Sequence, residues 1–213
     1  MKTKYVSAKS FVDVKPVLEK AIPHLKGKVG IITTVQFLHL MNDAKKFLES
    51  KNVKCEILGQ VLGCNSDVAK NSRDDTFLFI GDGVFHPRGF ILKQKKEIII
   101  ANPISNTVSK LGNEEIKKIE NLTYKGLTKF HSSKEIGVLV TLKPGQEHLM
   151  LALNLKNKFP DKNFYVLVFD ELNYQSLEDF PFVECFVNTM CLRISYDDAD
   201  KLPKAVVDYG DLE

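Results

Sequence analysis

The sequence has few cysteines, no long hydrophobic run and little net charge. Its 213 residues include four cysteines, and no apolar stretch approaches the ~18 residues of a membrane-spanning helix. The N-terminal stretch "MKTKYVSAKSFVDVK" has no apolar core of signal-peptide length. The net charge of +3 is too small to indicate nucleic-acid binding. We therefore expect a cytoplasmic protein with no membrane or nucleic-acid partner, whose cysteines are thiols or ligands rather than disulfides.

Several catalytic and binding motifs are also missing. No two cysteines have the C-x-x-C spacing of a zinc site. The stretch "GDGVFHPRG" matches neither a dinucleotide fingerprint nor a P-loop. No Ser–His–Asp order and no Cys–His pair is apparent. Local motifs alone therefore do not assign the chain to a common enzyme class.

What the sequence does contain is an alternation of strand-like and helix-like segments. Apolar stripes with helical spacing, such as 35–51 and 145–159, follow continuous β-branched runs. Residues 14–25 indicate a helix broken at Pro23, and residues 113–133 a connecting helix weakened around Gly126. The strand-like runs are 28–34, 53–58, 76–81, 97–102, 135–142, 163–170 and 183–189. This pattern predicts an α/β fold with mainly parallel sheets flanked by helices.

The second half of the chain repeats the first. Residues 30–34 ("GIITT") align with residues 137–141 ("GVLVT") at an offset of 107 residues, and "FLFIG" likewise falls over "ECFVN". The repeat predicts two similar α/β units, 1–107 and 108–213, rather than one continuous sheet.

Ligands of parallel α/β sheets bind beyond the carboxyl ends of the strands, and three unusual loops are expected there. They are "GQVLGCNSD" with Cys64, "GDGVFHPRG", and "NTMCLRISYDD" with Cys191 and Arg193. In the second loop the glycines permit a close turn and the polar groups reach the rim. Its candidate ligand-binding residues are Gly81, Asp82, Gly83 and His86.

A fourth stretch, "TLKPGQ", is expected to open a helix. Its Lys143, Gly145 and Gln146 would lie where free backbone N–H groups receive a carboxylate or phosphate. Cys55 and Cys185 fall inside strands and are expected to be inert core thiols. Asp197 and Asp198 form either a metal pair or, as we favour, the N-cap of a turn. From the residues alone, Cys64 and Cys191 are either packed thiols or ligands of something soft.

Taken together and in order, these motifs resemble a known family. "GQVLGCN", "FLFIGDGVFHPRG", "LKPGQ" and "VNTMCLRISYDD" are similar to stretches of the diphthamide-synthesis radical enzymes, the 2-(3-amino-3-carboxypropyl)histidine synthases. Residues 7–36 also resemble the stretch that leads into the family's middle domain. The similarity runs nearly from end to end of the chain.

The resemblance implies a specific chemistry. Family members have three similar α/β domains, and each offers one cysteine to a central [4Fe–4S] cluster. The iron without a cysteine binds S-adenosylmethionine, and an electron from the cluster releases a 3-amino-3-carboxypropyl radical that adds to a histidine of elongation factor 2. The matching cysteines are Cys64 and Cys191. The resemblance also suggests Arg193 and the segment near Gln146 as receivers of the methionyl carboxylate.

The sequence departs from the family pattern in ways that leave three hypotheses. It begins where the family's middle domain begins, and the familiar "ACPR" is "MCLR" here. The favoured hypothesis is a transferase that works with a partner subunit carrying the missing domain and third cysteine; its electron donor is unknown. The alternatives are a non-catalytic accessory subunit and a diverged α/β binding protein.

Overall fold

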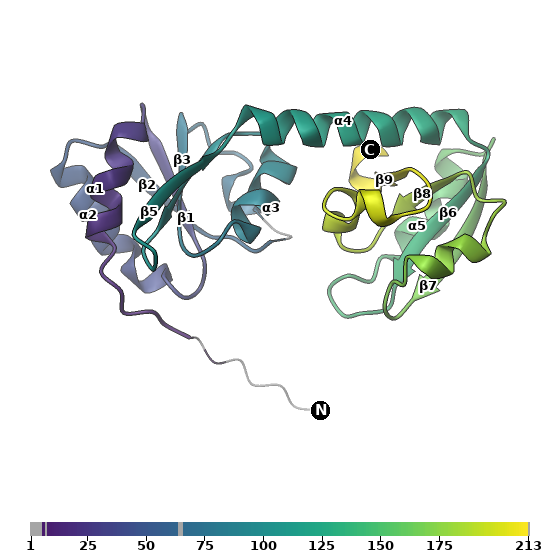
Figure 1. Cartoon of the computed structure of the whole chain (residues 1–213), viewed down its shortest axis with the longest axis horizontal. Helices are drawn as coiled ribbons and strands as arrows, with labels where there is room; N and C mark the ends of the chain where they lie inside the picture. Colours follow the sequence, from purple (N-terminus) through teal and green to yellow (C-terminus); the bar gives the residue numbers. More distant parts are fainter. Residues whose placement is uncertain (1–5, 7, 64–65, 213) are drawn as a thin grey trace. The chain divides into compact units, whose positions relative to one another are not determined.

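The computed structural model of this chain describes residues 6, 8–63 and 66–212 (Figure 1). The chain divides into two compact units, Met1–Ile116 and Lys117–Glu213. The sequence prediction placed this division at 107/108. Nine residues separate the two positions because strand β5 (Thr107–Leu111) pairs with β4 (Ile98–Asn102) and so belongs to the first unit.

The first unit contains a five-stranded sheet in the order β2-β1-β3-β4-β5. Strands β1 to β4 are parallel to one another, and β5 is antiparallel to β4. The remaining strands are β1 (Val29–Thr33), β2 (Cys55–Gln60) and β3 (Thr76–Ile80). All five residues of β1 are buried, as expected for a strand covered on both faces.

Helices cover both faces of this sheet. Leu78 and Ile80 share a core with α1 and α2, whereas the ring of Phe77 packs on that of Phe90 in α3, with centroids 4.9 Å apart. This alternation follows from the opposite directions of successive side chains in a strand. The helices are α1 (Lys15–Ala21), α2 (Met41–Ser50) and α3 (Phe85–Gln94), with 3-10 turns at Ile22–His24, Leu38–Leu40 and Asp67–Ala69.

The second unit contains a four-stranded, fully parallel sheet in the order β7-β6-β8-β9. Helices α4 and α5 cover one face, where Phe130 and Leu155 pack with Val138. The other face is covered by Leu177 and Leu202 from short turns. The strands are β6 (Glu135–Thr141), β7 (Asn163–Phe169), β8 (Cys185–Asn188) and β9 (Val206–Asp208). The helices are α4 (Asn113–Ser132), which begins in the first unit, and α5 (Leu149–Lys158), and 3-10 turns occupy Gln175–Asp179, Leu192–Ser195, Ala199–Lys201 and Tyr209–Leu212.

The two sheets share one topology, and the predicted α/β class with two similar units is confirmed. The orders β2-β1-β3-β4 and β7-β6-β8-β9 match strand for strand, so that β1 corresponds to β6 and β3 to β8. This is the correspondence that the 107-residue repeat indicates. The two candidate cysteines are nevertheless not equivalent in position. Cys64 follows β2, whereas Cys191 follows β8, the counterpart of β3.

Three local predictions need correction. The stretch 81–89 is not all loop, because α3 begins at Phe85. The helix expected at Gly145 begins instead at Leu149. Strands β5 and β9 were not predicted at all.

Among the described residues, none of the helices is both long enough and apolar enough to span a membrane.

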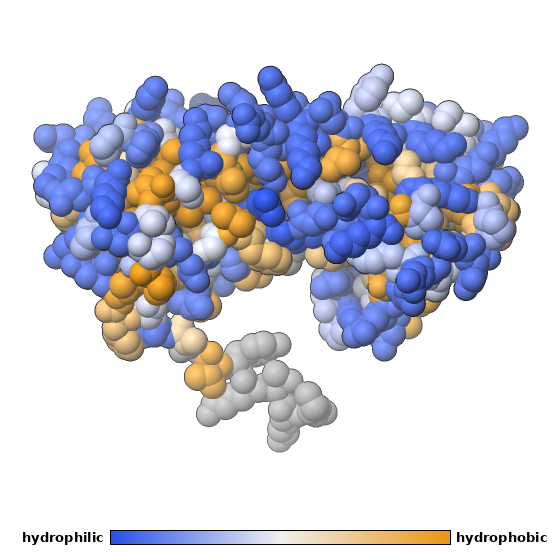
Figure 2. All heavy atoms as spheres, viewed as in Figure 1, coloured by the Kyte–Doolittle hydropathy of each residue, from blue (hydrophilic) through white to orange (hydrophobic). Residues whose placement is uncertain are grey.

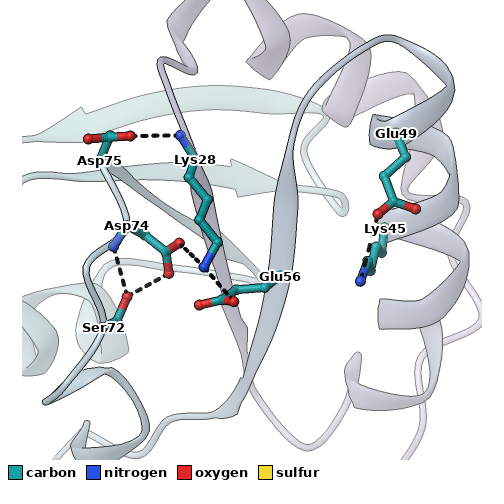
Figure 3. Close-up of polar contacts among 7 residues, drawn as sticks. All are labelled: Lys28, Lys45, Glu49, Glu56, Ser72, Asp74 and Asp75. Carbon is teal, nitrogen blue, oxygen red and sulfur yellow. Dashed lines mark hydrogen bonds and ion pairs between the residues drawn. The ribbon is translucent and has the colours of Figure 1, made fainter.

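A polar cluster joins the strand starts of the first sheet (Figure 3). Lys28 Nζ lies 2.5 Å from Glu56 Oε2 and 3.1 Å from Asp74 Oδ1, and the Asp74 side chain is fully buried. Ser72 Oγ donates a hydrogen bond of 2.5 Å to Asp74 Oδ2. The hydrogen bonds to Glu56 and Asp74 raise the pKa of Lys28. This cluster lies at the amino ends of the strands, so it fastens the sheet at the edge opposite the candidate loops.

Gly126 lies inside a continuous α4, so the expected weakening of this helix is not seen. The reason for a glycine here is packing: a Cβ on Gly126 would lie 2.4 Å from the carbonyl oxygen of Val206 in β9. The backbones of α4 and β9 therefore approach each other more closely than any side chain would permit.

We predict that Gly126→Ala destabilises the second unit, although alanine is the better helix former. Overpacking against a backbone atom costs about 1–3 kcal/mol, which exceeds the roughly 1 kcal/mol of gained helix propensity. Urea denaturation followed by circular dichroism measures the change. Asn121→Ala, at an exposed position of the same helix, is the control and should be neutral or stabilising. A stabilised Gly126→Ala protein would contradict the packing explanation.

Candidate functional site

In the first unit the backbone changes direction just before the Cys64 loop. The register between β1 and β2 shifts after Ile31, which pairs with Ile57, because Ile32 pairs with Gly59. Gly59 has φ +126°, a conformation that side chains rarely permit. The resulting bulge redirects the chain at the carboxyl end of β2, where Val61 N donates to Thr33 O at 2.8 Å.

Both flanks of Cys64 are fastened to helix α3. A Cβ on Gly89 would lie 2.1 Å from Gly63 O, and a Cβ on Gly63 would lie 2.0 Å from the ring of Phe85. On the other side, Gln94 Nε2 donates to both Ser66 O and Ser66 Oγ at 3.2 Å. Cys64 itself lies outside the described residues. Gly63, the residue before Cys64, lets its own segment of the chain lie against α3.

The candidate residues of the second loop surround the start of α3. Gly81 is buried at the end of β3, Gly83 has φ +69°, and the exposed Asp82 accepts a 2.7 Å hydrogen bond from Asn102 Nδ2. His86 is half-buried in the first turn of the helix, with its ring stacked on Phe79 at a centroid distance of 6.2 Å. Because Gly63 packs against Phe85 and Gly89, the described part of "GQVLGCN" lies against the motif "GDGVFHPRG" at the carboxyl edge.

Apolar side chains at this edge remain in contact with solvent. Leu62 is 48% exposed, Val84 43% and Phe85 53%. Figure 2 shows hydrophobic residues that reach the surface among a mostly hydrophilic exterior. Exposed apolar side chains next to one loop are typical of a surface that contacts another molecule.

In the second unit Cys191 lies three residues beyond the end of β8. It is partly exposed and its thiol is free. Its carbonyl oxygen accepts hydrogen bonds of 3.0 Å from both Asn188 Nδ2 and Ile194 N. Thr189 fastens the same loop to β6, because its N–H and hydroxyl both donate to Leu139 O. The backbone that carries this thiol is therefore held from both sides.

A polar group that sequence reasoning missed supports the Cys191 loop. Asp208, the last residue of β9, accepts a 3.0 Å hydrogen bond from Asn188 Nδ2 and a 3.4 Å hydrogen bond from Ser195 Oγ. Burial raises the pKa of Asp208. Asp208 lies opposite Asn188 in the pairing of β8 with β9. Sequence reasoning could not find it, because this pairing register cannot be read from the sequence.

Charged and phenolic side chains border Cys191. Arg193 forms an ion pair with Asp197, and Asp198 accepts a 2.9 Å hydrogen bond from Tyr174 OH. Burial, this hydrogen bond and the charge of Asp198 raise the pKa of Tyr174 to about 12. Asp198 lies at the N-cap position of the turn Ala199–Lys201 without a capping hydrogen bond. Asp197 and Asp198 thus serve two different partners and do not form a pair that chelates one ion.

The "LKPGQ" stretch forms an exposed turn. Gly145 has φ +82°, and Gln146 N donates to Lys143 O at 3.0 Å. Because α5 begins only at Leu149, Gly145 and Gln146 are not the first residues of a helix. The N–H of Gln146 donates within its own turn, so it is less available to an anion than a free N–H at a helix start.

The other two cysteines are core residues, as expected. Cys55 is 9% exposed and Cys185 is fully buried, and each is the first residue of its strand. Burial raises the pKa of both thiols, for Cys185 to about 12. Protonated, enclosed thiols are poor metal ligands, because the thiolate is the form that binds metals.

The loop of the second unit presents the sulfur of Cys191, a soft ligand, at the carboxyl edge of its sheet. Cys191 is accessible, and its loop is held in a fixed shape without occupying the thiol. Iron–sulfur clusters require such thiolates. Within the part of the chain that the structure describes, no three His, Cys, Asp or Glu side chains are grouped to hold a metal ion.

The fold and the loops define a class: a protein of two similar α/β units, each with a mainly parallel sheet, whose cysteine-bearing loops follow the carboxyl ends of parallel strands. Residues 1–213 match the model of a family described as "Putative diphthamide synthesis protein". The chain belongs to this family, which confirms the assignment made from the loop motifs.

Two curated relatives and one solved structure illustrate the similarity. The chain is 33% identical over 226 residues to 2-(3-amino-3-carboxypropyl)histidine synthase of Pyrococcus horikoshii, an alignment of 99% of this chain and 64% of the relative. It is 30% identical over 192 residues to the synthase of Methanocaldococcus jannaschii, with coverage of 87% and 51%. Dph2 from Pyrococcus horikoshii, solved with a 4Fe-4S cluster, matches with a TM-score of 0.79 and 30% identity over 96% of this chain and 62% of that one. The chain thus spans less than two thirds of the length of these proteins.

We predict that the thiols differ sharply in reactivity. In metal-free folded protein at mildly alkaline pH, iodoacetamide should modify Cys191 roughly 100-fold or more faster than Cys185, because only thiolates react and Cys185 is enclosed with a raised pKa. Peptide mass spectrometry over a time course measures both rates in one sample. Similar rates for Cys185 and Cys191 in folded protein would contradict the structure.

Proposed function

We propose that this chain is part of a 2-(3-amino-3-carboxypropyl)histidine synthase acting in the first step of diphthamide biosynthesis. In this role Cys64 and Cys191 are two cysteine ligands of a [4Fe–4S] cluster. The observation that carries the proposal is the position of Cys191, a free and accessible thiol on a fixed loop at the carboxyl edge of a parallel sheet. Family membership and the cluster in the solved Dph2 support it.

When bound, such a cluster supplies the electron that cleaves S-adenosylmethionine, whose 3-amino-3-carboxypropyl group is transferred to a histidine of elongation factor 2. The residues of this chain hold and orient the participants. Asn188 and Thr189 set the loop that presents Cys191. Helix α3 supports the Cys64 loop through Gly63 and Ser66.

The residues proposed to bind S-adenosylmethionine remain those of the loop motifs. In the first unit these residues are Gly81, Asp82, Gly83 and His86, which follow β3 at its carboxyl end. In the second unit Arg193 is the positive group next to Cys191, and its pairing with Asp197 holds it in place for a carboxylate. Gly145 and Gln146 have weaker support, because their turn precedes the helix.

A third ligand is proposed to come from polypeptide outside these 213 residues. In line with the resemblance, we place it on a partner subunit that carries a further α/β domain. The exposed Leu62, Val84 and Phe85 support this, since they offer apolar contact area beside the Cys64 loop. A second candidate function, that of an accessory subunit, is favoured by one observation: these residues offer two loop cysteines rather than three.

We predict that the four cysteines separate into two groups on anaerobic reconstitution with iron and sulfide. Cys64→Ala and Cys191→Ala should each lose the bound iron and leave the unfolding free energy within about 0.5 kcal/mol of the parent, because loop thiols contribute little packing. Cys55→Ala and Cys185→Ala should retain iron and lose about 1 kcal/mol of stability, because they leave small cavities. Iron analysis and urea denaturation measure the two effects. Equal loss of iron from Cys55→Ala and Cys64→Ala would show that the proposed assignment of the ligand cysteines is wrong.

We predict that the 213-residue chain alone does not modify elongation factor 2, and that a further α/β domain with one loop cysteine restores turnover. Two thiolates leave a cluster exposed and labile, since a metal site depends on its number of ligands and on the shell around them. The assay measures transfer from S-adenosylmethionine under reducing, anaerobic conditions. Full turnover by the chain alone would exclude the need for the added domain. Persistent inactivity with every such domain would favour the accessory function.

A further inference from the structure

We propose that Asn188 and Asp208 are positioning residues that form a clamp with Ser195 and fix the loop presenting the Cys191 thiol. The inference rests on the proposed function in one respect, namely that Cys191 is a ligand. The clamp itself is defined by hydrogen bonds among buried or partly buried side chains. Asn188 and Ser195 lie within the "VNTMCLRISYDD" motif, and Asp208 lies outside it.

Asn188 closes the turn that leads to Cys191. Its Nδ2 group donates to Cys191 O and to Asp208 Oδ2, each at 3.0 Å, and its Oδ1 accepts from Met190 N at 3.1 Å. The side chain is completely buried, and both of its amide protons and its oxygen are in use. Three hydrogen bonds from one buried group allow the segment from 188 to 191 a single arrangement.

Asp208 joins the two ends of the Cys191 loop. Its Oδ2 atom accepts from Asn188 before the cysteine and from Ser195 after it, and its Oδ1 atom accepts from Gly210 N at 3.1 Å. The backbone on either side of Cys191 is thereby tied to strand β9. Since Cys191 O also accepts from Ile194 N, rotation about the Cα–Cβ bond is the main freedom left to the thiol.

The placement of this clamp is better explained by the thiol than by the core. A buried amide and a carboxylate cost free energy unless every group finds a partner, and apolar residues would pack β8 on β9 without that risk. Here the polar atoms all converge on the segment that carries one accessible cysteine. Metal ligands depend on such supporting hydrogen bonds, because a loosely held ligand binds weakly.

The test measures the rate at which iodoacetamide modifies Cys191 in the metal-free full chain, resolved from the other cysteines by peptide mass spectrometry. We expect Asn188→Ala and Asp208→Ala to raise this rate by about fivefold or more, the effect of losing one net hydrogen bond from a restrained loop. Asp208→Asn keeps one acceptor oxygen, which can serve Asn188 and Ser195, but loses the acceptor for Gly210 N. Its rate should therefore lie between those of the parent and of Asp208→Ala.

Asp211→Ala is the matched control. Asp211 is a partly buried carboxylate of the same unit, and it accepts a 2.5 Å hydrogen bond from Tyr196 OH rather than from the clamp. It should lower the unfolding midpoint and leave the Cys191 rate within about twofold of the parent. Unchanged Cys191 rates in folded Asn188→Ala and Asp208→Ala would overturn the clamp, as would an equal rise in Asp211→Ala.

Buried Cys185 serves as the internal indicator of folding. If Cys185 also becomes reactive in Asp208→Ala, that variant has unfolded. The milder Ser195→Ala then tests the clamp by the same measurement, the rate of Cys191 modification in folded protein. Reconstituted iron content separates the clamp from the proposed function. Loss of iron in both Asp208→Ala and Cys191→Ala supports the clamp as well as the role of Cys191 as a cluster ligand. A faster Cys191 reaction, with iron unaffected by Cys191→Ala, keeps the clamp and rejects the cluster ligand.

Discussion

Parallel pairing of the strands is the constraint on which the rest of this structure depends. It directs the carboxyl ends of β1, β2 and β3 to one edge of the first sheet, and those of β6, β7 and β8 to one edge of the second. Loops that are distant in sequence therefore meet at each edge. The opposite edge of the first sheet is occupied by the ion pairs of Lys28, which connect the starts of the strands and leave the carboxyl edge to the candidate loops.

The two cysteine loops are secured by different physical means. Around Cys64 the flanking residues are held by close backbone approach, in which Gly63 and Gly89 exclude any side chain between the loop and α3. Around Cys191 the loop is held by polar groups, chiefly Asn188 and Asp208. The two loops also occupy different places in the topology, because the Cys64 loop follows β2 and the Cys191 loop follows β8, the counterpart of β3. The two cysteines therefore occupy positions that are not equivalent in the two similar units.

Much of the fold could be predicted because buried parallel strands appear as continuous apolar runs, and β1, β3 and β6 are such runs. Helix α3 could not, since Pro87, Gly89, Phe90, Ile91 and Leu92 are all buried and leave no amphipathic period to detect. Strand β9 is only three residues long. In the candidate site the cysteines stood out by residue type. Asp208 did not, because its partner Asn188 is 20 residues away and is reached only through the β8–β9 register.

We propose that Cys64 and Cys191 both bind iron in one cluster. The most direct measurement is a crystal structure of the anaerobically reconstituted protein, bound to whatever domain completes it, with anomalous scattering collected at the iron edge. We expect iron peaks at thiolate bonding distance, about 2.3 Å, from the sulfur atoms of both Cys64 and Cys191. Iron bound beside Cys55 or Cys185, or a complete cluster that contacts neither loop cysteine, would contradict the claim.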